Sequence, residues 1–391
     1  MSNTSIHKKR EVKSSKDIIH MAKELCSGML DDLEKARRPV LTATKCSLDN
    51  SFYNPKVGFL TPGDKMVRTE LNVSSVQKMA RSVFFMEILL RNLETGSVNN
   101  KRELYYIAKG ECKHNPSMKA LDFEDQNESD EIIDFIGEMM EVYREELNCF
   151  ANDRGGQTYS QHLIVEETMP NGEKATIDLS KLGTSPFMPK NRPQNLRLKA
   201  KNKIEFCLVV ESEGTANTLV ANGFCSRYKN IIIGAQGVPS NAVRSWTKLI
   251  QDQLDVPIYF FGDLDAYTLQ NIYRTLKAGS ASSLIRNSDF SAPEIKFLGV
   301  LPEDIKTYDL ADYAVKTTDA SEDRALKKAH DALNNDPFFK DKKNKGLADI
   351  LKWLVKEKRR CEQQALFMVN PRDPQMPEKI IVKKIREGNF V

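Results

Sequence analysis

The chain has 391 residues, which is too long for one ordinary domain and predicts two or three. Hydrophobic residues make up 40% of it and charged residues 29%, so it can bury a sizeable core, and this excludes wholesale disorder, collagen-like repeats and coiled-coil rods. The 58 basic and 54 acidic side chains leave a net charge of only +4, which does not by itself indicate a nucleic-acid partner.

The apolar and cysteine patterns indicate the cellular compartment. No apolar run approaches the roughly 18 residues that a membrane helix needs, and the first twenty residues contain no stretch of signal-peptide length. Seven cysteines without a CxxC pair are typical of free thiols, and five scattered histidines argue against a zinc site. We therefore expect an intracellular protein of a reducing compartment, in the cytoplasm or nucleoid, or in the nucleus if the source is eukaryotic, without a membrane partner.

Residues 1–66 are predicted to form an N-terminal arm and helix. A polar, basic arm is expected first, then an amphipathic helix at 16–37 and a loop at 38–66 that proline and glycine interrupt. The helix is expected either to pack on its own domain or to dock a partner subunit.

Residues 67–167 are predicted to form one module. Three helices are expected at 74–95, 100–110 and 129–147, and an alternating segment at 157–167 is typical of an edge strand. A turn is predicted between them at 152–156. Three helices followed by a hairpin is the order of a winged-helix module.

Residues 168–203 are predicted to be a basic linker. From residue 183 onward this stretch has no acidic side chain and six basic ones: Lys190, Arg192, Arg197, Lys199, Lys201 and Lys203. Such a run is either a solvated linker or a contact to the phosphate backbone of DNA.

After residue 203 short apolar runs alternate with helical stretches. The runs lie at 204–210, 230–235, 257–263 and 294–301, and the helices between them at 215–222, 240–254 and 267–279. This alternation predicts a parallel α/β sheet over 204–318, with ligands beyond the carboxyl ends of its strands. Residues 319–391 are predicted to be a C-terminal helical extension, strongly basic up to about residue 370.

Acidic side chains follow two of the predicted strands. Glu211 follows the first, and Asp263 and Asp265, which share one side of an extended chain, follow the third. If these strands are neighbours, the three carboxylates repel one another unless a cation neutralises them. Oxygen ligands without His or Cys indicate Mg²⁺, with Mn²⁺ as a substitute. The alternative is three solvated loop carboxylates.

Two further segments bear on phosphate chemistry. The loop GAQGVP at 234–239 precedes a helix expected near Ser240, where backbone could approach a phosphate, although such turns are also ordinary architecture. No Gly-Lys dipeptide occurs, so we expect no Walker A loop and no ATP bound through one. The segment KRELYY at 101–106 carries paired tyrosines, which are either core aromatics or include a nucleophile for phosphorus that an arginine and a metal would activate.

The chain resembles the A subunit of DNA topoisomerase VI, a family whose relatives include the meiotic transesterase that makes programmed double-strand breaks. The resemblance runs from about residue 38 to the C-terminus. It rests on KRELYY (101–106), FEDQNESD (123–130), VVESEG (209–214), GAQGVP (234–239), GDLDAY (262–267), FLGVLPEDI (297–305), EQQAL (362–366) and MPEKI (376–380).

The resemblance implies an α/β and α+β multidomain fold, in which a winged-helix tyrosine domain precedes a Toprim parallel α/β domain with a helical C-terminal extension. It implies that Tyr106 is the nucleophile and that Glu211, Asp263 and Asp265 bind the metal. Arg102 precedes Tyr106 by one helical turn and is expected either to contact the scissile phosphate or to be an exposed helix arginine.

The same resemblance implies a homodimer that acts on double-stranded DNA, cuts both strands and forms 5′-phosphotyrosyl links. A B subunit of the GHKL class, in an A2B2 heterotetramer, would bind the ATP and gate the passage of a second duplex. The expected enzyme is therefore a religating, ATP-dependent type IIB DNA topoisomerase. The alternatives are a meiotic-type break maker that does not religate and a non-catalytic DNA-binding relative.

The chain departs from the family at one place. The family usually reads DxDPxG after the third strand, whereas this chain has Ala266 and Thr268 in place of the proline and the glycine. The carboxylates remain, but the turn that follows must differ, since glycine tolerates backbone angles that threonine does not. His114 is expected to be an exposed histidine rather than the general base for Tyr106.

Overall fold

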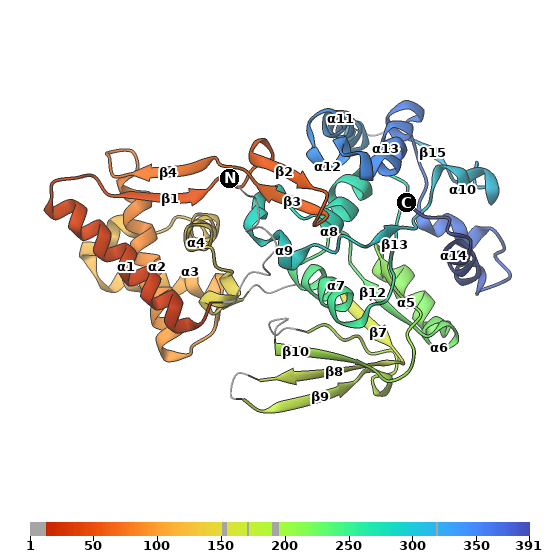
Figure 1. The fold of residues 1–391 in the computed structure, drawn as a ribbon, viewed down its shortest axis with the longest axis horizontal. Coiled ribbons are helices and arrows are strands. Elements are labelled where there is room, and N and C mark those ends of the chain that lie inside the picture. Colours follow the sequence, from red (N-terminus) through yellow and green to blue (C-terminus); the bar gives the residue numbers. More distant parts are fainter. Residues whose placement is uncertain (1–12, 151–154, 170–171, 190–194, 318–319) are drawn as a thin grey trace. The chain divides into compact units, whose positions relative to one another are not determined.

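The computed structural model describes residues 13–150, 155–169, 172–189, 195–317 and 320–391, with no side chains described at 320–322 (Figure 1). The chain divides into two compact units. The N-terminal unit comprises Met1–Asn50 and Pro62–Asn152, and the C-terminal unit comprises Ser51–Thr61 and Asp153–Val391. The chain therefore passes from one unit to the other more than once.

Four α-helices build the N-terminal unit: α1 (Ser15–Glu34), α2 (Val76–Thr95), α3 (Lys101–His114) and α4 (Gln126–Met140). Sequence signals set their ends. The Ser14 and Asp17 side chains form a capping box at the start of α1, and Gly96, in the left-handed region with φ 70°, ends α2. All four predicted helices form, but the fourth runs over 126–140 rather than 129–147. The Asp125 side chain caps its start, and Glu141, in the left-handed region with φ 52°, ends it.

The prediction of a continuous loop at 38–66 is wrong, because three short strands and the first residue of a fourth lie in this stretch. In the N-terminal unit β1 (Val40–Thr44) pairs antiparallel with β4 (Met66–Glu70), and β1 buries Leu41 and Ala43 on one face. The alternation covers only five residues, which is too short to outweigh the proline and glycine signals around it. Short elements complete this unit: η1 (Leu48–Asn50), η2 (Pro116–Leu121), η3 (Arg144–Leu147), and β5 (Asn99–Asn100) paired parallel with β6 (Cys149–Phe150).

Between β1 and β4 the chain forms a hairpin that belongs to the C-terminal unit. Its strands are β2 (Ser51–Asn54) and β3 (Phe59–Pro62). The ring of Tyr53 packs edge-on against Phe338, with centroids 5.5 Å apart, and the Asn287 side chain donates to the carbonyl of Leu60 at 3.0 Å. The hairpin thus packs against segments that follow it by more than two hundred residues.

A five-stranded sheet forms the centre of the C-terminal unit, in the order β14-β13-β11-β12-β7. The first four strands are parallel, as predicted, and β7 adds antiparallel to β12. Every residue of β11, β12 and β13 is buried, as a parallel sheet covered on both faces requires. The strands are β7 (Gln157–Ser160), β11 (Phe206–Val210), β12 (Asn230–Gly234), β13 (Ile258–Phe261) and β14 (Lys296–Phe297).

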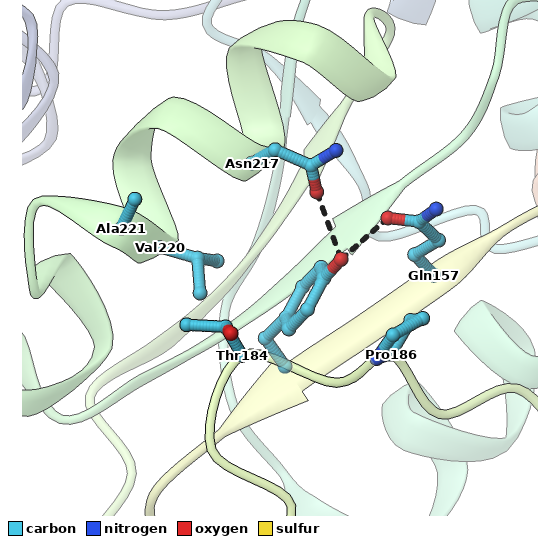
Figure 2. A pocket seen from close by; sticks show the side chains of 7 residues that line it. Gln157, Thr184, Pro186, Asn217, Val220 and Ala221 are labelled. Carbon is cyan, nitrogen blue, oxygen red and sulfur yellow. Dashed lines mark hydrogen bonds between the residues drawn. The ribbon is translucent and has the colours of Figure 1, made fainter.

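Helices connect these strands: α5 (Glu213–Ala221), α6 (Phe224–Tyr228), α7 (Asn241–Leu254), η6 (Thr268–Tyr273), α8 (Arg274–Ala278), η7 (Ala281–Arg286) and α9 (Asn287–Phe290). Next to β7 and α5 lies a pocket of about 390 Å³ (Figure 2). In it the hydroxyl of Tyr159 is close to the side-chain oxygens of Gln157 and Asn217. The pocket lies at the β7 edge of the sheet and includes none of Glu211, Asp263 and Asp265, which follow β11 and β13.

The segment predicted as one edge strand at 157–167 forms two strands instead. β7 joins the large sheet, and β8 (Leu163–Thr168) joins β9 (Lys174–Asp178) and β10 (Leu196–Ala200) in an antiparallel sheet of order β10-β8-β9. Both strands lie in the C-terminal unit, so the units divide near residue 152 rather than at 167. The predicted turn at 152–156 lies partly outside the described residues.

The stretch predicted as a basic linker, 168–203, is therefore not only linker, since it contains β9, β10 and the last residue of β8. Lys199 of β10 forms an ion pair with Glu166 of β8, and Lys201 pairs with Asp178 at 3.0 Å. These two ion pairs use basic side chains that the sequence suggested for DNA or solvent. Lys190 and Arg192 lie outside the described residues.

The C-terminal stretch is helical, as predicted. Its elements within 319–391 are α11 (Ala320–Asn335), α12 (Pro337–Lys340), η8 (Lys342–Asn344), α13 (Lys345–Glu357), β16 (Arg359–Arg360), η9 (Gln363–Met368) and α14 (Met376–Glu387). Before them, in the range predicted for the sheet, lie α10 (Pro302–Thr307) and β15 (Val315–Lys316). The C-terminal stretch returns to the sheet at its end, where Val391 exchanges two backbone hydrogen bonds with Phe297 of β14. None of the helices in the described parts of the chain is long and apolar enough to cross a membrane.

Candidate active site

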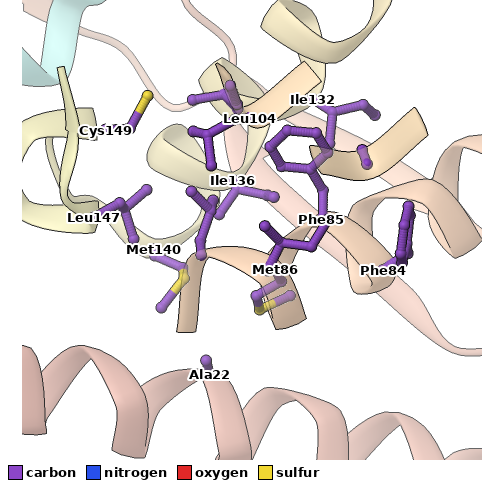
Figure 3. Close-up of a cluster of buried hydrophobic side chains, with 14 of the residues drawn as sticks. Ala22, Phe84, Phe85, Met86, Leu104, Ile132, Ile136, Met140, Leu147 and Cys149 are labelled. Atoms are coloured by element: carbon purple, nitrogen blue, oxygen red, sulfur yellow. The ribbon is translucent and has the colours of Figure 1, made fainter. Parts of the chain in front are cut away.

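Helix α3 starts at Lys101 because a capping box fixes its first turn. The side chain of Asn100 accepts from the backbone of Glu103 at 2.9 Å, and the Glu103 carboxylate accepts from the backbone of Asn100 at 2.8 Å. Leu104 and Ala108 then fall on the buried face of the helix and contribute to the core of the N-terminal unit (Figure 3). Tyr105 and Ile107 also pack against this core and are partly buried, whereas Tyr106 is exposed.

The two tyrosines of α3 have different surroundings. Tyr105 is half-buried against the core, and its hydroxyl donates to the carbonyl of Glu124 at 3.3 Å. Tyr106 is 57% exposed, and the structure shows no hydrogen bond from its hydroxyl to any residue that it describes. Tyr106 is therefore the more exposed tyrosine of the pair, and its hydroxyl has no partner among the described residues.

Arg102 lies one turn before Tyr106 on the exposed face of α3, with its guanidinium carbon 5.9 Å from the centroid of the Tyr106 ring. The neighbouring Lys101 is directed elsewhere, to Asp130 and Asp134 at 3.5 Å each. The exposed face thus presents a phenol beside a guanidinium. His114, the last residue of α3, is exposed as predicted, and its Nδ1 lies 2.6 Å from the carbonyl of Gly110.

In the C-terminal unit β11 and β13 are adjacent, which was the condition for the predicted carboxylates to meet. The backbone of Glu211 donates to the carbonyl of Phe261 at 2.9 Å, and the backbone of Asp263 donates to Oε2 of Glu211 at 3.0 Å. Gly262 is required between them, since a Cβ there would lie 2.6 Å from Oε2 of Glu211 and 2.5 Å from the ring of Phe260. This glycine was not predicted to matter, although it stands inside GDLDAY.

Thr268 connects two of the carboxylates. Its Oγ1 lies 3.0 Å from each carboxylate oxygen of Glu211 and 3.2 Å from Oδ2 of Asp265. Its backbone N–H donates to Oδ1 of Asp265 at 2.7 Å. Thr268 is fully buried, so its hydroxyl lies among the carboxylates that it contacts.

Burial and mutual repulsion disfavour the charged forms of these carboxylates. Burial, followed by the charge of Asp263, raises the pKa of Glu211 to about 8, and burial raises the pKa of Asp263 to about 6. Burial also raises the pKa of Asp265. A site that disfavours several negative charges at once favours either protons or a cation.

Glu211, Asp263 and Asp265 lie close to one another, but their oxygens do not converge on one position where an ion could bind. In the described part of the chain no three His, Cys, Asp or Glu side chains are arranged to hold a metal ion as they stand. The contacts explain this. The hydroxyl of Thr268 lies between Glu211 and Asp265, and Asp263 accepts from the backbone of Gln363 at 2.9 Å. Ligation of an ion by all three would require these side chains to turn.

A C-terminal segment completes the surroundings of the cluster. Leu264 and Cys361 exchange backbone hydrogen bonds of 2.9 and 3.1 Å, which places Gln363 next to Asp263. Gln363 is 1% exposed, and its side-chain oxygen has no hydrogen-bond partner among the residues that the structure describes. Gln363 was not predicted to join the site, although it belongs to EQQAL.

The glycine-containing loop after β12 packs beside the same strand end. Gly237, with φ 79°, donates to the carbonyl of Glu211 at 3.0 Å, and the side chain of Gln236 donates to Glu213 at 2.5 Å. Helix α7 follows with Ser240 as its cap, as predicted. The contacts of this loop are thus structural and do not decide between its two interpretations.

Both parts of the chain match descriptions of known families. Residues 77–149 match the family model "Type IIB DNA topoisomerase". Residues 206–380 match the family model for the Toprim domain of Spo11 and of the A subunit of topoisomerase 6. The first range contains α3 with its tyrosines, and the second contains the carboxylate cluster.

Curated relatives match over nearly the whole length, and each is named as the A subunit of type 2 DNA topoisomerase 6. The chain is 32% identical to the protein of this name from Methanocaldococcus jannaschii, over 95% of each chain. Those from Pyrococcus horikoshii and Natronomonas pharaonis are 28% identical, over 96% of this chain and 95% of the relative, and 27% identical, over 81% and 83%. The chain therefore belongs to the family of topoisomerase 6 A subunits, within the type IIB DNA topoisomerases.

Proposed function

We propose that this chain is the DNA-cleaving and religating subunit of an ATP-dependent type IIB topoisomerase. The observation that carries the proposal is the exposed Tyr106 beside Arg102 on α3, in a chain whose C-terminal unit gathers three partly buried carboxylates. The names of its relatives supply the reaction class.

The chemistry is a reversible transfer of a phosphodiester. The Tyr106 oxygen attacks a backbone phosphorus, a new P–O bond forms to the tyrosine, and the bond to the 3′ oxygen breaks. The 3′ oxygen takes up a proton, and the DNA 5′ end remains linked to the protein. Attack by the 3′ hydroxyl on the phosphotyrosine restores the strand, so neither step consumes ATP.

Two side chains of α3 divide this work. The phenol of Tyr106 must lose its proton, because the neutral form is a weak nucleophile. The Arg102 guanidinium matches the geometry of a phosphate, orients it toward Tyr106 and stabilises the charge that develops on its oxygens. Tyr105 holds α3 against the core rather than reacting, since its hydroxyl is bonded to Glu124.

Glu211, Asp263 and Asp265 would hold Mg²⁺, with Mn²⁺ as a substitute. The residues fit a hard cation, because three carboxylates with raised pKa values lie close together and offer only oxygen ligands. When bound, the ion supplies a Lewis acid for the leaving 3′ oxygen. The carboxylates must rearrange to receive it, because they do not converge as they stand.

The partners follow from the same proposal. The chain acts as a homodimer on double-stranded DNA, with one Tyr106 for each strand. A GHKL-type B subunit binds the ATP and completes an A2B2 heterotetramer. Two rival functions remain: break formation without religation, and DNA binding without cleavage. The non-catalytic function is favoured over the break maker, because the carboxylates must rearrange before they can hold a metal.

Supercoiled plasmid tests the proposal. The chain is incubated with plasmid and Mg²⁺, with and without ATP and the B subunit, then denatured and digested with protease. Protein-linked double-strand breaks are expected and, when ATP and the B subunit are present, relaxed circles. Breaks without relaxed circles would support the break maker, and plasmid that is bound but never linked would support the non-catalytic relative.

A further inference from the structure

The hydroxyl of Thr268 is placed where oxygens of two proposed metal ligands meet. It is fully buried and lies 3.0, 3.0 and 3.2 Å from two oxygens of Glu211 and one of Asp265. No other side-chain hydroxyl of the described residues lies within hydrogen-bond distance of these two carboxylates. Thr268 is therefore a specific link between them.

A threonine hydroxyl has one proton, and a carboxylate only accepts. The single proton of Thr268 is consequently shared among oxygens of both acids. The hydroxyl keeps these oxygens 3.0–3.2 Å from its own oxygen, which is longer than the distance at which they would bind a cation. The backbone N–H of Thr268, 2.7 Å from Asp265 Oδ1, fixes the second acid to the start of η6. Both contacts belong to one residue, so the acids are tied together through it.

A divalent cation would have to displace this link. Mg²⁺ binds oxygens at about 2.0–2.1 Å and arranges them octahedrally. The hydroxyl already occupies the space between Glu211 and Asp265, which agrees with the absence of a metal-holding triad in the described residues as they stand. A side chain without a hydroxyl at this position would remove that hydrogen-bonded link.

We infer that Thr268 competes with the divalent cation for Glu211 and Asp265 and so sets the metal concentration that the site requires. This inference rests on the proposed function, since it takes the three carboxylates as the metal ligands. It assigns to Thr268 the role of a positioning residue that selects between a metal-free and a metal-bound arrangement.

Titration of the DNA-free full-length protein with Mn²⁺, followed by the paramagnetic resonance signal of the free ion, tests the inference without reference to cleavage. Thr268→Val removes the hydroxyl and keeps the shape, so its Mn²⁺ affinity should rise about three- to tenfold, the equivalent of one hydrogen bond. Thr268→Ser keeps the hydroxyl and should bind like wild type. Thr268→Ala should follow Thr268→Val, which guards against a misfolded valine variant.

The matched control is Thr247→Val. Thr247 is also fully buried, but its hydroxyl donates to the carbonyl of Val243 at 2.8 Å within α7. Its affinity for Mn²⁺ should stay at the wild-type value. Asp263→Asn should abolish the binding and thereby show that the measured ion occupies the carboxylate site.

The outcomes separate the inference from the proposed function. Equal or weaker Mn²⁺ binding by Thr268→Val and Thr268→Ala, with wild type binding normally, overturns the competition and leaves the metal site standing. Binding by neither wild type nor the Thr268 variants overturns the metal site itself. A larger rise of the melting temperature with Mn²⁺ in Thr268→Val than in wild type would support the competition independently, because ligand stabilisation grows with affinity.

Discussion

The two tyrosines of α3 can be tested separately, because substitution by phenylalanine removes only the hydroxyl oxygen from each. Tyr106→Phe should abolish covalent cleavage and leave folding and DNA binding intact, because the ring keeps its apolar body. Tyr105→Phe removes only the hydrogen bond to the carbonyl of Glu124. Its cleavage rate should stay within about threefold of wild type, and its stability should fall by about 1 kcal/mol. Trapping of protein-linked DNA by both variants measures this, and a linked product from Tyr106→Phe would refute the assignment.

Arg102 is predicted to act through the shape of its guanidinium as well as its charge. Arg102→Lys should lower the cleavage rate by about tenfold or more, since the two-pronged contact with phosphate is lost although the charge remains. Arg38→Lys is the matched control, because Arg38 is an arginine of the same unit whose side chain is 70% exposed. Single-turnover cleavage rates compare the two variants. Equal rates for Arg102→Lys and Arg38→Lys would show that Arg102 is an exposed helix arginine without a role in cleavage.

The carboxylates at the ends of β11 and β13 should contribute to activity more than to stability. Glu211→Ala and Asp263→Ala should abolish cleavage in Mg²⁺. Thermal melts in EDTA should show a loss of stability of no more than about 1 kcal/mol, because each change removes the cost of burying that acid and its repulsion of the other two. Glu205→Ala, an exposed acid just before β11, is the control. A purely structural cluster would give the reverse, with early melting and retained cleavage.

The buried pair between α10 and α14 should act in the opposite way. Lys384 and Asp304 are almost fully buried, and Lys384 also donates to the carbonyl of Gly299 at 3.0 Å. Lys384→Met should cost about 3–5 kcal/mol, because Asp304 is left without its partner in the interior. Urea unfolding measures this. The exposed neighbour variant, Lys383→Met, should stay within about 0.5 kcal/mol, and a similar loss in both would exclude the pair as the cause.

The predictable elements are those with long or continuous patterns. The helix faces of α1 to α4 and the buried runs of β11 to β13 follow from periodicity, and the strand-end positions of Glu211, Asp263 and Asp265 followed with them. The strands β1 and β4 did not, since five-residue strands carry little pattern. Gln363 could not be placed either, because only the backbone bridge between Leu264 and Cys361 brings it to Asp263.

For the whole molecule, the sequence predicted two chemical centres but not where the chain divides. The boundary expected at residue 167 followed the helix-helix-helix-hairpin order, whereas β7 pairs with β12, which follows it by some seventy residues along the chain. No local pattern reports such a pairing. For the same reason, Lys199 and Lys201 were predicted as part of a linker, because their acidic partners stand on the strands β8 and β9.

The hairpin β2–β3 has a consequence for the order in which the chain becomes native during its synthesis. Residues 51–61 leave the ribosome early, yet their partners, among them Phe338 and Asn287, are among the later residues to emerge. At about 5–20 residues per second, the hairpin waits on the order of tens of seconds for these contacts. During that interval Leu60, which is fully buried at the end, has no native cover, and the N-terminal unit must fold while its own sequence is interrupted by a segment that belongs to the other unit.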